Sequence, residues 1–178
     1  IDDLIIIIAK RSLGLKARQK LFAQLLIAGI VITFLLRNQV STGQLVPFTD
    51  FELVFPKLGW GQLIFFFFAL FVLVGGSNAV NLTDGLDGLA AGSTAIASLF
   101  MAVLLLFQKQ TDLAVFALAL AGACFGFTWF NGPPAQVFMG DTGSLALGGA
   151  LGGMALFGRL TLFLPIIGGV FVAETLSV

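Results

Sequence analysis

The sequence predicts an all-α, polytopic integral membrane protein with about six transmembrane helices, because its composition and its hydropathy pattern agree. Of its 178 residues, 58% are hydrophobic and only 10% are charged, whereas a soluble domain carries about 25% charged residues. The apolar residues gather in runs long enough to cross a bilayer, and polar segments separate these runs. We therefore expect residues 1–178 to form a single transmembrane domain in a lipid bilayer.

The expected spans follow one another along the chain. The first apolar run covers 21–36. Because a helix rises about 1.5 Å per residue and the bilayer core is about 30 Å thick, we expect this span to begin near Ala17. The longest connection, 38–60, contains alternating apolar residues at 51–55 that predict a short strand. The other spans are expected at 61–77, 89–107, 113–130, 145–157 and 161–178.

The glycine, cysteine and histidine content gives further information on helix packing and on possible sites. Glycines in the fifth span, at 148, 149, 152 and 153, predict that another helix approaches it closely. Cys124 is the single cysteine and lies in an apolar run, so no disulfide framework is available. The chain contains no histidine, so neither a histidine ligand nor a histidine base belongs to these residues.

Polar residues spaced three apart interrupt the apolar pattern between the second and third spans. These are Asn78, Asn81, Asp84 and Asp87. An Asp at the centre of a spanning helix costs roughly 2.5–3.5 kcal/mol, so such residues need a reason. A helical step of three turns a side chain by about −60°, and each Asp precedes a Gly, which is a turn signal. We expect the helix to fray into a loop here, with the four side chains converging on one pocket. The alternative is an interfacial loop with ordinary helix caps.

Counting one crossing per span distributes the connections over two faces. One face holds 2–20, 78–88 and 131–144, and the other holds 38–60, 108–112 and 158–160. The segment 10–20 carries five of the nine Lys and Arg residues, which assigns its face to the cytoplasm by the positive-inside rule. Five of the nine acids share that face, and helix packing is expected to bring them together. They are Asp2, Asp3, Asp84, Asp87 and Asp141.

Carboxylates gathered at a membrane face suit a hard divalent cation such as Mg²⁺, which takes oxygen ligands and keeps waters for substrate phosphates. The basic segment beside them suits an anionic phosphate or anionic lipid heads, or it serves topology alone. Asp2 and Asp3 would diverge by about 100° on a helix, so we expect different roles for them, unless they only close a helix end. Glycines at 140 and 143 free the backbone around Asp141. This fits a phosphate- or metal-binding loop and fits a helix cap equally well.

Two segments carry a family resemblance. N-A-V-N-L-T-D-G-L-D-G-L-A at 78–90 and P-A-Q-V-F-M-G-D-T-G-S-L-A-L-G-G at 134–149 resemble the signatures of the polyprenyl-phosphate sugar-1-phosphate transferases. The acid pair Asp2–Asp3 and the segment 14–20 resemble other parts of that family, and the resemblance covers essentially the whole chain.

The resemblance implies a catalytic domain of the bacterial inner (plasma) membrane, acting on its cytoplasmic face. Its branch of the family transfers phospho-N-acetylmuramoyl-pentapeptide from UDP-N-acetylmuramoyl-pentapeptide to undecaprenyl phosphate. Mg²⁺ is required, UMP leaves, and the product is the first lipid intermediate of peptidoglycan synthesis. No nucleic acid is involved. Family members are commonly homodimers, and the sequence locates no interface.

The resemblance also implies roles for individual residues. Asp141 matches the Mg²⁺-binding acid, and Asn81 is a candidate further ligand. Asp2 or Asp3 matches the group that deprotonates the lipid phosphate, which makes these two and Asp141 the implied catalytic residues. Substrate-binding positions are also implied, among them a uridine pocket at 85–87 with a stacking aromatic at 138. They are Asn78, Asp84, Gly85, Leu86, Asp87, Phe138 and Lys20.

Two departures and two alternatives accompany the resemblance. The family has helices before the acid pair and a His-rich loop after the sixth span, and the 178 residues contain neither. We therefore expect a fragment that is inactive alone. A sibling transferase that uses UDP-N-acetylglucosamine would share the core motifs. A membrane transporter would place its acids at mid-span, whereas these lie at span ends.

Overall fold

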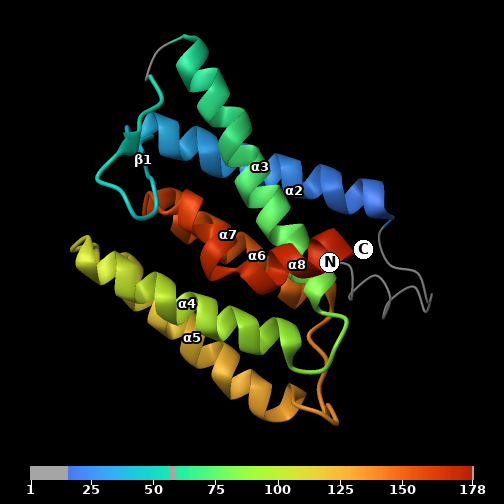
Figure 1. Ribbon diagram of the computed structural model, residues 1–178. Coiled ribbons are helices and arrows are strands. Elements are labelled where there is room, and N and C mark those ends of the chain that lie inside the picture. The colour runs from blue at the N-terminus through green and yellow to red at the C-terminus, as the bar shows by residue number, and fades with distance from the viewer. Residues whose placement is uncertain (1–15, 57–58, 178) are drawn as a thin grey trace.

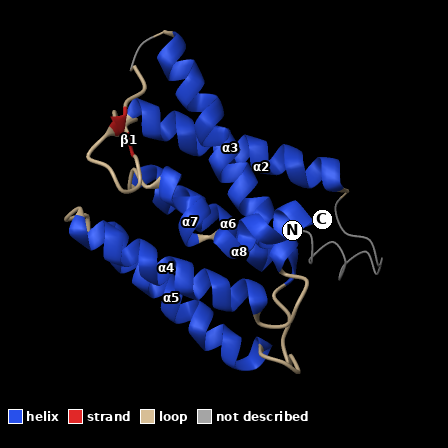
Figure 2. Ribbon diagram, in the orientation of Figure 1, coloured by secondary structure: helices blue, strands red, loops and turns tan. Residues whose placement is uncertain are grey.

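The computed structural model describes residues 16–56 and 59–177. These residues form a bundle dominated by long helices, with one small two-stranded hairpin (Figure 2). Four helices, α2 to α5, are long and apolar enough to cross a membrane. The long helices are α2 (Ala17–Arg37), α3 (Trp60–Thr83), α4 (Leu89–Phe107), α5 (Thr111–Asn131) and α6 (Gly140–Phe157).

The predicted spans agree with the helices best where polar connections bound them on both sides. Helix α2 begins at Ala17 and α4 covers 89–107, both as expected. Helix α3 instead continues through Asn78 and Asn81 to Thr83, so the helix ends later than the sequence suggests. Helix α6 begins at Gly140, ahead of the predicted span, because the positive φ of 67° at Gly140 turns the chain directly into the helix.

The predicted sixth span over 161–178 is not one continuous helix. Its described part is divided into a 3₁₀ turn and two short helices, and α6 therefore leads into a broken segment. Pro165 lies in the first turn of the middle piece, and Gly168 ends that piece. Pro165 lacks a backbone N–H, and Gly168 favours the end of a helix. Apolar composition alone therefore overestimated the length of the sixth span. The pieces are η1 (Thr161–Phe163), α7 (Leu164–Ile167) and α8 (Gly169–Ser177).

The helices pack as two antiparallel pairs with α2 added to one of them (Figure 1). Helices α4 and α5 form a hairpin, while α3 crosses α6 at very close range. A Cβ on Gly148 would lie 2.4 Å from the Gly76 carbonyl oxygen, and one on Gly152 would lie 3.2 Å from the Val72 oxygen. The predicted close helix approach is thus confirmed at these two glycines. The other two, at 149 and 153, have no described neighbour within 4 Å of such a Cβ.

A β-hairpin lies at one end of the bundle, near the predicted strand. Strands β1 (Gln44–Leu45) and β2 (Glu52–Leu53) pair antiparallel. The hairpin is fixed to the chain after α6, because Thr161 Oγ1 donates a 2.6 Å hydrogen bond to Gln44 Oε1 and Arg159 forms an ion pair with Glu52.

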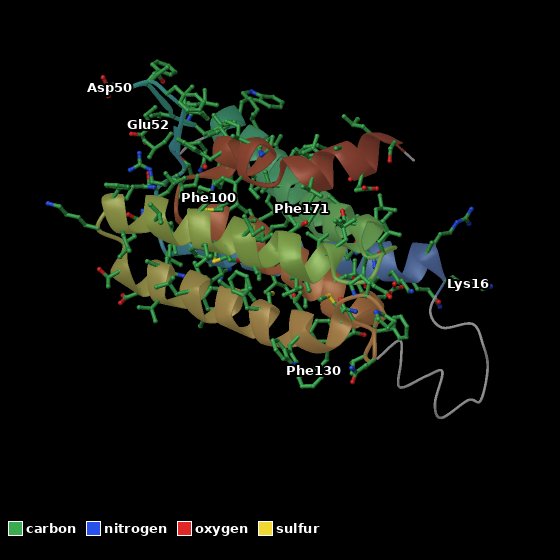
Figure 3. The ribbon with its side chains drawn as sticks, turned by 60° about the horizontal axis from the view of Figure 1, so that its bottom comes forward. Lys16, Asp50, Glu52, Phe100, Phe130 and Phe171 are labelled. Atoms are coloured by element: carbon green, nitrogen blue, oxygen red, sulfur yellow. The ribbon has the colours of Figure 1, made fainter. Side chains whose placement is uncertain are left out.

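The loops 84–88 and 132–139 and the start of α2 gather at the opposite end (Figure 1). Figure 3 shows this separation of the two ends, with Lys16 and Phe130 on one side and Asp50 and Glu52 on the other. For the part of the connections that the structure describes, the grouping agrees with the one expected from counting crossings.

Candidate active site

Asp141 lies in the first turn of α6 at the point where three helices meet. Its carboxylate forms an ion pair with Lys20 of α2. From α3, Asn81 Nδ2 donates a 3.0 Å hydrogen bond to Asp141 Oδ1. Three residues that are far apart in sequence, and that the motifs single out, are therefore in direct contact.

Ser144 completes this cluster and was not among the predicted site residues. Asn81 Nδ2 donates a second hydrogen bond to Ser144 Oγ at 2.9 Å, and Ser144 Oγ donates to the Gly140 carbonyl at 3.0 Å. Ser144 is fully buried. Because the amide nitrogen of Asn81 contacts both Asp141 and Ser144, the rotation of the Asn81 side chain is fixed. The only sequence signal for Ser144 is its position in the G-D-T-G-S motif.

The four residues of the polar quartet do not converge on one pocket. Asn78 turns towards α2, where its Nδ2 donates to Gln24 Oε1 at 2.9 Å, and it also donates to the Val74 carbonyl of its own helix. The reason is that the helix continues through Asn81, so the −60° step between quartet members separates their directions. Asp84, which closes α3, and Asp87, in the following loop, do border the same cavity as Asn81.

A small pocket of about 250 Å³ collects most of the predicted residues. Burial, and then the negative charge of Asp141, raise the pKa of the Asp84 carboxyl above its ordinary value. The pocket also offers exposed apolar side chains, Leu86 and Phe138. Its lining comprises Asn81, Asp84, Gly85, Leu86, Asp87, Asn131, Phe138, Met139, Gly140 and Asp141.

The side chains of Asp87 and Asn131 hold the loops of this pocket together through hydrogen bonds. Asp87 Oδ2 accepts a 3.0 Å hydrogen bond from the Ala135 N–H. Asn131 Oδ1 accepts one from the Gly88 N–H at 3.0 Å, and Asn131 Nδ2 donates to the Val137 carbonyl at 2.8 Å. Asn131 was not among the predicted site residues, because an amide at the end of an apolar run is also typical of an ordinary helix end.

A larger groove of about 700 Å³ opens on the other side of the Lys20–Asp141 pair. Its walls come mainly from α2, α3 and α6, and they are mostly apolar apart from the end that carries this pair. Asp141 therefore borders a polar pocket on one side and an apolar groove on the other. This position is suited to chemistry between a water-soluble and a lipid-borne reactant.

Oxygen donors for a cation are present, although they are few. In the part of the chain that the structure describes, no group of three or more His, Cys, Asp or Glu residues is arranged to hold a metal ion. Asp141 and Asp84 nevertheless interact as like charges, whereas Asn81 turns its amide nitrogen, and not its oxygen, towards Asp141. The two carboxylates match the donor preference of Mg²⁺, which completes its shell with water and phosphate. The acid pair Asp2–Asp3 lies outside the described residues.

Comparison with known proteins identifies the family. The model of the family "Glycosyl transferase family 4" matches residues 1–159. The chain is 54% identical over 178 residues to a phospho-N-acetylmuramoyl-pentapeptide-transferase of Geobacillus kaustophilus, covering 100% of the chain and 53% of that relative. It is 51% identical over the same coverage to the phospho-N-acetylmuramoyl-pentapeptide-transferase of Bacillus subtilis. The chain thus spans about half the length of the curated relatives it matches. By the extent of these matches, the chain belongs to glycosyl transferase family 4.

Proposed function

We propose that the protein containing this chain transfers phospho-N-acetylmuramoyl-pentapeptide from its UDP carrier to undecaprenyl phosphate, releasing UMP. The observation that carries the proposal is the position of Asp141, which contacts Lys20 and Asn81 and lies between a polar pocket and an apolar groove. The names of the relatives support the same donor group.

The reaction requires an anion to attack an anion. An oxygen of the lipid phosphate forms a bond to the phosphorus that bears the sugar, and the bond from that phosphorus to the UMP oxygen breaks. UMP leaves with the electron pair, and the product is a lipid diphosphate. Because both reactants are negatively charged, positioning and charge neutralisation supply most of the catalysis.

The residues of the chain divide this task between them. Lys20 places a cation beside Asp141, where the phosphates would meet. We propose that Asp141 and Asp84 would hold Mg²⁺, while Asn81, the candidate further ligand, orients the Asp141 carboxylate through its amide nitrogen. When bound, the ion neutralises phosphate charge and orients the diphosphate. The exposed ring of Phe138 and the side chain of Leu86 offer apolar surface for the uracil ring.

Further parts of the proposal concern residues and assemblies beyond the described chain. Asp2 or Asp3 is proposed as the base for the lipid phosphate. The site is proposed to face the cytoplasm at the bacterial inner membrane, and the homodimer stays a prediction.

The test uses the full-length protein in detergent with Mg²⁺ and undecaprenyl phosphate. UMP release is followed with UDP-N-acetylmuramoyl-pentapeptide and with UDP-N-acetylglucosamine, offered separately. We expect release only from the muramoyl donor, and a loss of at least about 100-fold in Asp141→Asn. Asp112→Asn is the matched control, because Asp112 lies in the first turn of α5 at the other end of the bundle.

The outcomes separate the candidate functions. Release only from UDP-N-acetylglucosamine would move the protein to the sibling branch with unchanged chemistry. Release from neither donor in a folded preparation would contradict the transferase and reopen the transporter hypothesis. That hypothesis is disfavoured by the described acids of the site, because Asp84 and Asp141 lie at helix ends and not at mid-span.

A further inference from the structure

The two loops that form the small pocket are joined through one buried side chain. Asn131 is the last residue of α5 and is only 3% exposed. Its Oδ1 accepts from the Gly88 N–H at 3.0 Å, and its Nδ2 donates to the Val137 carbonyl at 2.8 Å. Both ends of the amide are used, so any rotation of the side chain would break both hydrogen bonds.

The backbone of both loops packs close to Asn131. Gly88 has a φ of 77°, a left-handed conformation, and a Cβ there would lie 3.6 Å from the Asn131 carbonyl oxygen. On the other side, the loop 132–139 folds back on α5, because the Gln136 N–H donates to the Phe130 carbonyl at 2.8 Å. Asn131 therefore lies between two loops that each return to it.

The groups held by Asn131 are adjacent in sequence to the pocket wall. Val137 directly precedes Phe138, and Gly88 directly follows Asp87. Phe138, Asp87 and Asn131 itself line the small pocket. A shift of either loop relative to Asn131 would thus change the distance between the aromatic ring on one wall and the carboxylate on the other.

We propose that Asn131 is a positioning residue that sets the spacing of the two loops for the nucleotide part of the donor. This inference rests on the proposed function, and it adds a residue for which the motifs had suggested no role. Loss of the amide is expected to weaken donor binding much more than turnover, because the cluster around Asp141 makes its own contacts with α2 and α3.

The experiment compares Asn131→Ala and Asn131→Asp in the full-length protein. The alanine variant loses both hydrogen bonds, whereas the aspartate variant keeps an acceptor for Gly88 and loses the donor to Val137. Asn38→Ala is the matched control, because Asn38 Nδ2 donates a hydrogen bond to the Phe34 carbonyl within the last turn of α2, at the end of that helix far from the site. We would measure four properties of the wild-type protein and of the three variants. They are KM for each substrate, kcat, UMP affinity by equilibrium dialysis and the midpoint of thermal unfolding.

We expect donor KM and the UMP dissociation constant to rise about tenfold or more in Asn131→Ala, with acceptor KM within about twofold. The aspartate variant and the control test whether the effect follows the lost bonds. Unchanged donor KM in a folded alanine variant overturns the inference. Equal changes in both KM values and in kcat would also overturn it, and so would failure of both Asn131 variants to fold. Either of these results would mean that Asn131 has a structural role only. If the wild-type protein neither binds UMP nor releases it, the proposed function fails instead.

Discussion

At the scale of single residues, the orientation of Asp141 depends on an amide that contacts two acceptors. Asn81 Nδ2 lies 3.0 Å from Asp141 Oδ1 and 2.9 Å from Ser144 Oγ. The second contact fixes the first, because an amide held at one acceptor cannot swing away from the other. Ser144 thereby acts on Asp141 through Asn81, without touching the pocket side of the carboxylate.

This arrangement makes a substitution of Ser144 informative. Ser144→Ala should destabilise the protein by about 1–2 kcal/mol, because it removes the hydrogen bonds of the hydroxyl to Asn81 and to the Gly140 carbonyl, and it should lower turnover by loosening Asn81. Ser98→Ala is the matched control. Ser98 is equally buried on α4, and among the described residues its Oγ has no hydrogen-bond partner. The thermal unfolding midpoint and UMP release are measured, and equal effects of the two substitutions would contradict the role given to Ser144.

Residue types and spacing selected Asn81 and the acids of the candidate site, but they did not select Ser144 or Asn131. Asn81, Asp84 and Asp87 could be selected because polar groups in an apolar context need a reason, and Asp141 because glycines surround it. Ser144 and Asn131 could not be selected, since their partners come from other elements or from backbone groups. Such contacts depend on tertiary packing and leave no periodic pattern.

At the scale of elements, the crossing of α3 and α6 supports the whole site. The crossing brings Asn81 of α3 to Asp141 of α6, and Ser77 Oγ donates a 2.8 Å hydrogen bond to the Leu145 carbonyl between them. Gly148 and Gly152 lie farther along the same contact and allow the two backbones to approach. Glycine spacing predicted this approach correctly. It could not predict which two of the four glycines face α3, because that depends on the rotation of α6.

A methyl group at the crossing should therefore disturb the site from a distance. In Gly148→Ala the added Cβ would lie 2.4 Å from the Gly76 oxygen and 2.6 Å from the Ser77 Cα, both backbone atoms that cannot yield independently. We expect a loss of about 1–3 kcal/mol in stability and a clear fall in UMP release, as the helices move apart. Gly122→Ala on α5 is the control, because no described atom lies within 4 Å of its added Cβ. Retention of full activity and stability by Gly148→Ala would show that the crossing tolerates separation.

At the scale of the whole molecule, the polar groups are divided between two ends. One end holds the small pocket and the Lys20–Asp141 pair, and the other holds the hairpin with its Arg159–Glu52 ion pair. Counting crossings could predict this division, because each span carries the chain from one face to the other. It could not predict the break after α6, where Pro165 and Gly168 interrupt an apolar run that composition alone reads as a span.

The same division leads to a test of orientation in the membrane. In a cysteine-free version of the full-length protein, Gln136→Cys places a thiol in the exposed loop at the site, and Asp50→Cys places one in the exposed turn of the hairpin. Because 10–20 carries five of the nine basic residues, the positive-inside rule directs the site to the cytoplasm. A membrane-impermeant maleimide should therefore label the thiol at 136 only in inverted membrane vesicles and the thiol at 50 only in spheroplasts. The reverse pattern would place the site outside the cytoplasm, where a UDP-linked donor is not made. Labelling of both thiols from one side would contradict the number of crossings between the hairpin and the loop 132–139.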